Sequence, residues 1–450
     1  MPSPISLDII IVGAGLGGLA AAISCSLAGH KVRILEQTRT LGEVGAGIQV
    51  PPNASRILAK WGLMPQFQKV SVSPGAIRLR RYSDGKVLSE QPFVPDAESD
   101  YGAPYCNVHR ADYHALLVSK ARELGIKIIL DARVQEVDFS APSVTLSNGN
   151  QLVADLIIGA DGLKSHLRSL LLGRKEAPYL TGDLAYRVLI SAEKMRQDPA
   201  LVDLATKPMF NIWMGPNMHA VCYLLKGGTI YNIVLCCPDN LPTDINIAPA
   251  KDGEVEELFT AWDPRLHKLF RLAHGIQKWR LENSREIETW VHQEGKFALL
   301  GDACHSTLPY LAQGAAMAVE DGDLLGELLE KIQTKEQVPD VLKIYEYLRK
   351  PRTEYVVKSS TSQRDVFHLL DGEEQRNRDR IMLADVVMPG FPNKWRDHGF
   401  RNWLFGYDTA KEAEKGWGRY VKEGRFWNSW SANSKGPQAA RMRGEFRFSL

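Results

Sequence analysis

Residues 8–36 constrain the fold of this chain more than any other stretch of its 450 residues. They run DIIIVGAGLGGLAAAISCSLAGHKVRILE. Ile9 to Val12 predict a short buried strand, Leu16 to Ala28 a helix of small apolar residues, and Lys31 to Leu35 a second strand. Two parallel strands need a crossover between them, so this order predicts a βαβ unit that opens a parallel sheet with helices.

Three glycines between the first strand and the helix have the G-x-G-x-x-G spacing of a dinucleotide-binding turn. Gly13 makes the tight turn, Gly15 lets the backbone approach a pyrophosphate, and Gly18 lets the helix pack closely on the strand. The N–H groups at the start of the helix favour phosphate there. Glu36 follows the second strand and can accept hydrogen bonds from the ribose hydroxyls of an adenosine. The unit therefore predicts binding of an adenosine-containing dinucleotide.

The uncharged run from Ile9 to Gly29 is long enough to resemble a membrane span or a signal peptide. No Lys or Arg precedes it, Asp8 adjoins it, and its glycines have the nucleotide-binding spacing, so we expect no membrane anchor here. The formal net charge of +2 gives no global field toward nucleic acid or anionic lipid. A small-molecule partner is therefore expected, while the oligomeric state is left open.

The cysteines show neither a C-x-x-C pair nor, with the histidines, the spacing of metal ligands. This pattern argues against a structural zinc site and against a secreted disulfide framework. We expect no metal site and a reducing, cytoplasmic location, with the thiols buried as small apolar groups. There are six: Cys25, Cys106, Cys222, Cys236, Cys237 and Cys304.

Further along the chain, residues 37–49 predict a loop, whose GAGIQ segment is too flexible for the interior of an element. Residues 178–292 differ in character, because strand-like segments follow one another with turns between them. They predict an antiparallel sheet with one face free to form a pocket wall. The expected strands are 184–191, 209–214, 219–225 and 230–236.

The predicted fold is thus α/β: a Rossmann-like domain interrupted by an antiparallel substrate domain, with a helical C-terminal extension. We place the first domain at 1–177 and 293–370, the second at 178–292 and the extension at 371–450. The many large aromatics between 395 and 430 predict that the extension is packed, whereas the last ~20 residues are polar and basic and predict disorder.

Two further strand ends narrow the identity of the nucleotide. Leu156 to Gly159 ends in Ala160-Asp161-Gly162, and Phe297 to Leu300 ends in Gly301-Asp302. The opening unit and these two strand ends together resemble the three-part pattern of the group A FAD-dependent aromatic-ring monooxygenases. The three parts follow one another in the same order as in that family. The resemblance covers residues 8–370, and Asn402 to Asp408 is similar to fungal salicylate-hydroxylase-like enzymes.

The resemblance implies FAD as cofactor and NADPH or NADH as co-substrate. Glu36 would hold the adenosine ribose, and Asp302 the ribityl hydroxyls. The other implied contacts are Gly47 and Gln49 along the cofactor, Arg110 on the pyrophosphate side, Asp161 toward FAD and the nicotinamide donor, and Gly314 and Ala315 at a helix start beside the flavin. One departure is Ala312, where the family often has glycine before Gln313-Gly314; its methyl group is expected to shift the ring or the pocket.

The implied activity is hydroxylation of a phenolic or other aromatic molecule through a flavin hydroperoxide, in secondary metabolism or aromatic degradation. The protein must position the ring and help to ionise a phenol. Arg187 is the candidate cation for a carboxylate or phenolate, and Tyr223 the candidate group that orients or deprotonates the hydroxyl; related fungal enzymes place an Arg and a Tyr comparably. His219 lies two strand periods from Tyr223, on the same face, and is the alternative acid or base.

Other functions remain open at this level. Epoxidation or oxidation of an indole or alkene would use the same cofactor chemistry. A flavin halogenase is disfavoured because the Trp-x-Trp-x-x-Ile segment of that family is absent from the sequence. A non-catalytic nucleotide-binding module is the alternative of another class. The sequence identifies neither the substrate and its regiochemistry nor the choice between NADPH and NADH.

Overall fold

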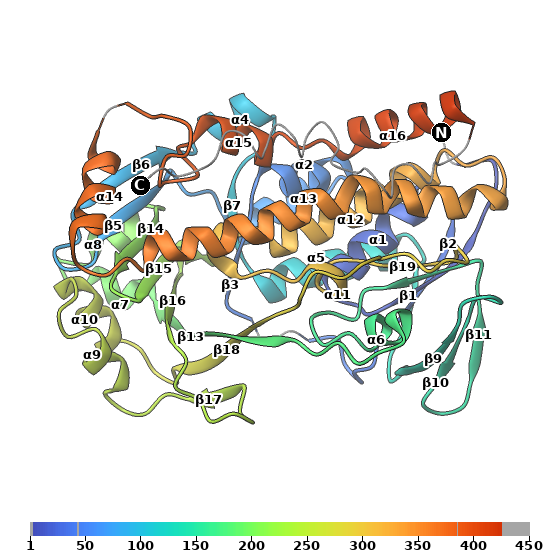
Figure 1. The fold of residues 1–450 in the computed structure, drawn as a ribbon. Helices are drawn as coiled ribbons and strands as arrows, with labels where there is room; N and C mark the ends of the chain where they lie inside the picture. The colour runs from blue at the N-terminus through green and yellow to red at the C-terminus, as the bar shows by residue number, and fades with distance from the viewer. Residues whose placement is uncertain (1–2, 43–44, 385, 425–450) are drawn as a thin grey trace.

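The computed structural model describes residues 3–42, 45–384 and 386–424. It is built around two sheets, one parallel and one mainly antiparallel, joined along one side by a long helix, α13 (Val338–Phe367) (Figure 1). Within the described residues, no helix combines the length and apolar character needed to cross a bilayer. The predicted disorder of the last ~20 residues, and Trp427 and Trp430, lie outside the described part of the chain.

The first sheet has five parallel strands in the order β19-β12-β1-β2-β8. The predicted βαβ unit opens it, and the two later glycine-bearing strands, β12 and β19, lie beside β1. This order brings three strand ends that are far apart in sequence to one edge. The strands are β1 (Asp8–Val12), β2 (Lys31–Leu35), β8 (Lys127–Ile129), β12 (Leu156–Gly159) and β19 (Phe297–Leu299).

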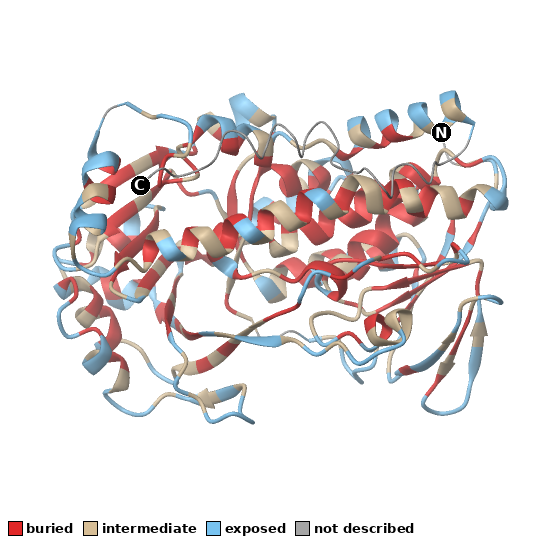
Figure 2. Cartoon of the chain, viewed as in Figure 1, coloured by how far each residue is buried: buried red, intermediate tan, exposed pale blue. Residues whose placement is uncertain are grey.

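Helix α1 packs between α12 and α5 against this sheet, and its residues are among the most deeply buried of the chain (Figure 2). Small side chains make this possible: a Cβ on Gly322 of α12 would lie 2.4 Å from the backbone nitrogen of Ala21. The run of small residues predicted as a helix is therefore a helix–helix contact surface. The bounds are α1 (Leu16–Leu27), α5 (Arg110–Glu123) and α12 (Gly314–Leu329).

The second sheet has eight strands in the order β17-β18-β13-β16-β15-β14-β5-β6. Neighbours are antiparallel except β14 and β5, which are parallel. The four expected strands are present, but β5 and β6 come from residues 76–92, far from the others in sequence. The bounds are β5 (Ala76–Arg81), β6 (Val87–Pro92), β13 (Tyr179–Ser191), β14 (Phe210–Gly215), β15 (Met218–Leu225), β16 (Ile230–Pro238), β17 (Ile247–Pro249) and β18 (Gln277–Asn283).

Strand alternation gives this sheet two different faces. Tyr186, Trp213 and Cys222 belong to a core under the short helices at one face, whereas Ile212 and Tyr223 belong to a core with α13 and the C-terminal residues at the other. The helices around the first core are α7 (Ala192–Arg196), α8 (Val202–Thr206), α9 (Glu254–Leu258) and α10 (Pro264–Arg271).

A small sheet, β3-β7-β4, corrects one prediction. Gly47 to Gln49 were expected in a loop, but they lie in β3, paired antiparallel with β7 from Gly47 opposite His109 to Val50 opposite Cys106. The pairing holds Gly47 in an extended conformation, which the composition of residues 45–49 did not predict. The strands are β3 (Gly47–Val50), β4 (Ser71–Val72) and β7 (Cys106–His109); a separate sheet holds β9 (Val134–Asp138), β10 (Ser143–Leu146) and β11 (Gln151–Val153).

Part of the described C-terminal extension packs against the rest of the protein. Trp395, Phe400 and Leu404 are buried in the core that includes Tyr223, and α16 contacts α12 and α13. The remaining helices are α2 (Pro52–Lys60), α3 (Met64–Val70), α4 (Asp96–Tyr101), α6 (His166–Leu172), α11 (Asp302–His305), α14 (Glu373–Leu383), α15 (His398–Phe405) and α16 (Thr409–Glu423), with the 3₁₀ turns η1 (Lys226–Gly228), η2 (Pro309–Leu311) and η3 (Lys335–Gln337).

Candidate active site

The three glycines of the opening turn have distinct surroundings. Gly13 has a φ of +109°, and a Cβ on it would lie 2.3 Å from the carbonyl oxygen of Ala160. A Cβ on Gly18 would lie 2.0 Å from the carbonyl oxygen of Gly13. By contrast, no described atom beyond the chain neighbours of Gly15 lies within 4 Å of its would-be Cβ. Packing of the protein thus requires Gly13 and Gly18, while Gly15 borders open space.

That open space fits a phosphate group. No side chain of the described residues caps the start of α1 by a hydrogen bond. The first-turn N–H groups of α1 therefore have unused donors, and the helix dipole favours an anion there.

Glu36 and Asp161 lie on the wall of a hollow of about 790 Å³ at the carboxyl edge of the parallel sheet, together with Gly13 and Gly15. The Glu36 carboxylate accepts hydrogen bonds from the backbone N–H groups of Ala14 and Thr38, both at 2.9 Å. Each carboxylate oxygen has a second lone pair, so Glu36 can still accept from a ribose. The hollow is large enough for a nucleoside.

Asp161 has a structural role as well as a place in the hollow. Its carboxylate accepts from the hydroxyl of Ser165 at 2.5 Å and from the backbone N–H of Leu167 at 3.0 Å. Ser165 in turn caps α6 by accepting from the N–H of Arg168. Asp161 therefore fixes the turn that forms one side of the hollow.

Asp302 and Arg110 lie near each other, at the starts of α11 and α5. The Asp302 side chain is exposed, yet the surrounding protein is close enough that burial raises its pKa, against the lowering effect of His305 and Arg110. The exposed Asp302 carboxylate can accept hydrogen bonds from a hydroxyl-bearing ligand.

Helix α12 begins at Gly314, followed by Ala315, and no side chain of the described residues caps this end. Just before it, Ala312 has φ +57° and ψ 36°, in the left-handed region. An L-residue pays roughly 1–2 kcal/mol in this conformation, which glycine does not. The backbone conformation therefore explains the preference for glycine that the resemblance implies at this position.

Arg187 of β13 and Tyr223 of β15 come together, although β16 lies between these two strands in the sheet. Both line a cavity of about 90 Å³, and Gly47, Gln49 and Ala312 belong to the same lining. Two of the predicted cofactor contacts, Gly47 and Gln49, thus share one cavity with the predicted catalytic pair. The tertiary structure brings β3 against the face of the second sheet, where the N–H of Gly47 donates to Asn232 at 3.0 Å.

Tyr223 is tightly held. Its ring stacks on Phe210 with centroids 5.1 Å apart, and a Cβ on Gly47 would lie 2.5 Å from its hydroxyl oxygen. Burial raises the pKa of Tyr223, which outweighs the nearby Arg187 and a hydrogen bond with Gln49. The phenol of Tyr223 is therefore neutral near pH 7.

Arg187 is a desolvated cation. Its guanidinium carbon lies 4.9 Å from the ring centroid of Trp279, and its Nε has no hydrogen-bond partner among the described residues. Burial lowers the pKa of Arg187, and the neighbouring Arg110 lowers it further. An anionic ligand would stabilise this charge.

His219 also lines the cavity, and its Nδ1 lies 2.8 Å from Nε2 of His368. His368, Tyr310 and Trp395 are residues that the sequence did not single out for the site, although Tyr310 and Trp395 line the same cavity. No spacing or motif marks them; only the richness in aromatics after residue 395 pointed to packing there. Among the described residues, no group of three or more His, Cys, Asp or Glu side chains could hold a metal ion.

Comparison with known proteins matches residues 6–360 to the family described as "FAD binding domain". The FAD-dependent monooxygenase OpS4 of Beauveria bassiana (strain ARSEF 2860) is 39% identical over 414 residues, which is 91% of this chain and 96% of that protein. The chain belongs to the FAD-dependent monooxygenases.

Two other comparisons agree with this assignment. The 3-hydroxybenzoate 6-hydroxylase of Polaromonas naphthalenivorans (strain CJ2) is 30% identical, over 91% of this chain and 98% of that protein. A salicylate hydroxylase solved as a substrate complex has the same fold, with a TM-score of 0.76 and 23% identity over 91% of this chain and 98% of that chain. This chain is therefore an enzyme, a monooxygenase that uses FAD with NAD(P)H as co-substrate, and a purely nucleotide-binding module is wrong as a description.

Proposed function

We propose that this monooxygenase hydroxylates a phenolic ring, with Arg187 binding the anionic oxygen of the substrate and Tyr223 orienting its hydroxyl. The observation that carries the proposal is the cavity lined by both residues and by Gly47, Gln49 and Ala312. One wall is the mainly antiparallel sheet, and the other is made by the segments that we assign to the flavin. A ring bound there lies between the two.

We infer that FAD is held along the carboxyl edge of the parallel sheet. The inference is supported by the open space at Gly15, the acceptors of Glu36 in the adjoining hollow and the accessible carboxylate of Asp302. When bound, FAD supplies the oxidation chemistry, since it accepts hydride from NAD(P)H and activates O₂. The assigned residues are Gly13, Gly15, Gly18, Glu36, Gly47, Gln49, Arg110, Asp161, Asp302, Gly314 and Ala315.

The substrate class follows from the charges of the cavity. Arg187 is a half-buried cation that the surrounding protein desolvates, and Arg110 is near enough to depress its pKa. A carboxylate or phenolate would relieve this repulsion, whereas a neutral arene would not. The name of the 3-hydroxybenzoate 6-hydroxylase relative, a phenolic acid hydroxylase, supports the same class. The apolar walls, including Phe210 and Trp395, would exclude water from the reacting ring.

The test uses the purified FAD-bound protein, NADPH or NADH, and a panel of phenolic acids paired with their O-methyl ethers. We expect a hydroxylated product by mass spectrometry from one or more phenols and none from the ethers. Product from an indole or alkene, with none from any phenol, would replace this proposal by epoxidation or a related oxidation.

Two variants test the residue roles. Arg187→Ala should reduce kcat/KM by about 100-fold, because a desolvated charge-assisted contact is worth about 2–5 kcal/mol. Tyr223→Phe should reduce it about tenfold through the loss of one hydrogen bond. The matched control is Tyr186→Phe: Tyr186 adjoins Arg187 in β13 but faces the other core, where its hydroxyl bonds Glu254. If Arg187→Ala and Tyr223→Phe form product at the wild-type rate, as the control is expected to, neither residue belongs to the site.

We also propose the domain division given by the sequence, with residues 1–177 and 293–370 for FAD, 178–292 for the substrate and 371–450 as extension. The two separate sheets support it, with β5 and β6 added to the second sheet.

A cytoplasmic location is proposed as well, because all six cysteines lie within the described residues and are free and buried. Fluorescence microscopy of the tagged protein would test that location.

A further inference from the structure

Trp395 brings an unpaired hydrogen-bond donor to the cavity that Arg187 and Tyr223 line. The residue is only 3% exposed, and its indole Nε1 has no hydrogen-bond partner among the described residues. A buried indole N–H usually finds an acceptor, because an unpaired one forfeits the hydrogen bond that it made with water. Trp213 shows the usual case, since its Nε1 donates to Asp263 at 2.8 Å. Trp395 therefore has a donor for which the described part of the protein supplies no acceptor.

An unpaired indole does not by itself mark a binding site. Trp61, at the C-terminal end of α2, is also 3% exposed, and its Nε1 likewise has no partner among the described residues. Trp61 packs in the apolar core around the parallel sheet and is not one of the described residues that line the cavity. Trp395 differs because it borders the cavity, from which a ligand can supply the acceptor.

The chain around Trp395 is fixed from two sides. Asn393 donates from Nδ2 to the hydroxyl of Ser89 in β6 at 3.0 Å, and its Oδ1 accepts from the backbone N–H of Trp395 at 3.1 Å. From α13, Nε2 of Gln363 donates to the carbonyl oxygen of Pro392 at 3.1 Å. A donor that is held in this way loses little conformational freedom when a ligand binds to it.

The charges of the cavity indicate which acceptor fits. Among the described residues that line it, Arg187 is the only Lys or Arg, and none is Asp or Glu. The cavity can therefore balance one negative charge, which the proposed function assigns to the anionic oxygen of the substrate. A second anion would have no cation beside it, and an unpaired charge away from water is costly. The group that accepts from Trp395 is therefore expected to be neutral.

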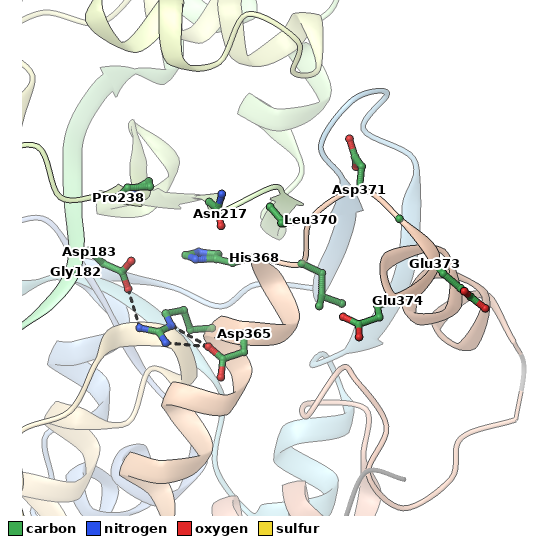
Figure 3. A pocket seen from close by; sticks show the side chains of 13 residues that line it. Gly182, Asp183, Asn217, Pro238, Asp365, His368, Leu370, Asp371, Glu373 and Glu374 are labelled. Atoms are coloured by element: carbon green, nitrogen blue, oxygen red, sulfur yellow. Dashed lines mark hydrogen bonds and ion pairs between the residues drawn. The ribbon is translucent and has the colours of Figure 1, made fainter. Parts of the chain in front are cut away.

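An acidic surface hollow of about 580 Å³ supports the same conclusion. The Trp395 ring lies nearly parallel to that of Phe367, with 8° between their planes, and the next residue, His368, lines the hollow. The field of the carboxylates there disfavours a second anion near Trp395 but not a neutral oxygen. Figure 3 shows His368 in this hollow, whose lining holds one arginine, Arg364, and the acidic residues Asp183, Asp365, Asp371, Glu373 and Glu374.

We propose that the indole N–H of Trp395 donates a hydrogen bond to a neutral carbonyl oxygen of the substrate, and so selects a phenol that carries an acyl, ester or lactone group. The proposal rests on the proposed function, because it takes the anionic oxygen at Arg187 as the other contact. A carbonyl suits the donor because it only accepts hydrogen bonds, whereas a second hydroxyl would bring a donor that needs an acceptor of its own. Trp395 acts by binding, and no proton is transferred.

The experiment removes the N–H and keeps the shape of the ring. Trp395 is replaced by 3-benzothienylalanine through suppression of an amber codon, so that sulfur stands where the N–H was. The ligands are acetyl-substituted phenols and their isopropenyl counterparts, in which C=CH₂ replaces C=O. Dissociation constants are measured from the flavin spectrum of the FAD-bound enzyme without NAD(P)H, so that binding is recorded apart from turnover.

The measured quantity is the preference for the acetyl phenol over its isopropenyl counterpart. We expect the replacement at Trp395 to lower this preference about tenfold, as the loss of one hydrogen bond should. The effect of the carbonyl on the acidity of the phenol is the same in both proteins and cancels in the comparison. The same replacement at Trp61 is the matched control and should leave the preference within about twofold of the wild type. Trp395→Phe should lose the preference too, with weaker binding of both ligands because its ring is smaller.

Two results would overturn the role of Trp395 and leave hydroxylation of a phenol intact. An unchanged preference after the replacement at Trp395 would show that this residue only forms part of the wall. Equal losses at Trp395 and Trp61 would show that the effect does not depend on the cavity. A wild type that binds and hydroxylates no phenol at all would instead refute the proposed function, and the inference with it.

Discussion

Gly47 should be intolerant of even a methyl group, because the Tyr223 ring occupies the space where its Cβ would be. A Cβ at this position would lie 2.5 Å from both Cε2 and the hydroxyl oxygen of Tyr223 and 2.8 Å from Cζ. Carbon atoms in contact stay about 3.5–4.0 Å apart. Gly47→Ala therefore requires the ring, or β3, to move by about 1 Å.

The ring has little room to move. Tyr223 is 1% exposed, and its ring is stacked on Phe210. Overpacking at such a site costs about 1–3 kcal/mol in the free energy of unfolding. A displacement of about 1 Å of a substrate-positioning group costs about 100-fold in activity. We expect Gly47→Ala to show both losses.

A double-mutant cycle isolates this contact. The free energy of unfolding in urea and kcat/KM are measured for the wild type, Gly47→Ala, Tyr223→Ala and the double variant. Once the ring is absent, Gly47→Ala should cost less than about 0.5 kcal/mol, so the two changes should couple by at least about 1 kcal/mol. Costs of Gly47→Ala that agree within about 0.5 kcal/mol in the two backgrounds would refute the steric explanation.

Further expectations follow from the same structure. Gly15→Ala should weaken FAD binding at least about tenfold with little change in the free energy of unfolding in urea. Gly18→Ala, whose Cβ would lie 2.0 Å from a carbonyl oxygen, should lower that free energy by about 1–3 kcal/mol. Identical flavin absorbance and identical unfolding of the two variants would contradict this. Glu320→Gln should cost about 3–5 kcal/mol, because it removes a buried carboxylate that pairs with both Arg349 and Arg352, and a loss under 1 kcal/mol in urea would count against these contacts. Although burial opposes it, neighbouring cations hold the pKa of Asp321 at about 2, below its usual value, so its stabilising contribution is complete above about pH 4 and is lost as the pH falls toward 2. Acid unfolding followed by tryptophan fluorescence should lose this component in Asp321→Asn, and an unchanged profile would contradict it.

Much of the nucleotide-binding half could be predicted because its determinants are local. The strand, the glycines, the helix and Glu36 lie within 29 consecutive residues, and the requirements on Gly13 and Gly18 arise from contacts within that unit and with the adjoining β12 turn. Side-chain alternation likewise placed His219 and Tyr223 on one face of a strand, as the structure has them.

Other features depended on pairing between distant segments. The sequence alone predicted Gly47 to Gln49 as a loop, because composition carries no information about β7 as a partner. It also gave no reason to join β5 to β14, whose parallel pairing extends the second sheet. Ala312 stood out as a departure from the family, but its left-handed conformation became visible only in the folded chain.

The amino-acid sequence by itself predicted an adenosine-containing dinucleotide, because the groups expected to recognise its phosphate and ribose lie in a short, contiguous unit; two further strand ends and the family resemblance then narrowed it to FAD. The tertiary structure decided the shape of the reacting cavity, which takes its walls from β3, β13, β15, the turn before α12 and the C-terminal residues near Trp395. It also decided that His219 meets His368, 149 positions further along the chain. The physical reason is that such contacts form only when several buried faces pack at once, and no local spacing specifies which distant side chain fills the remaining space.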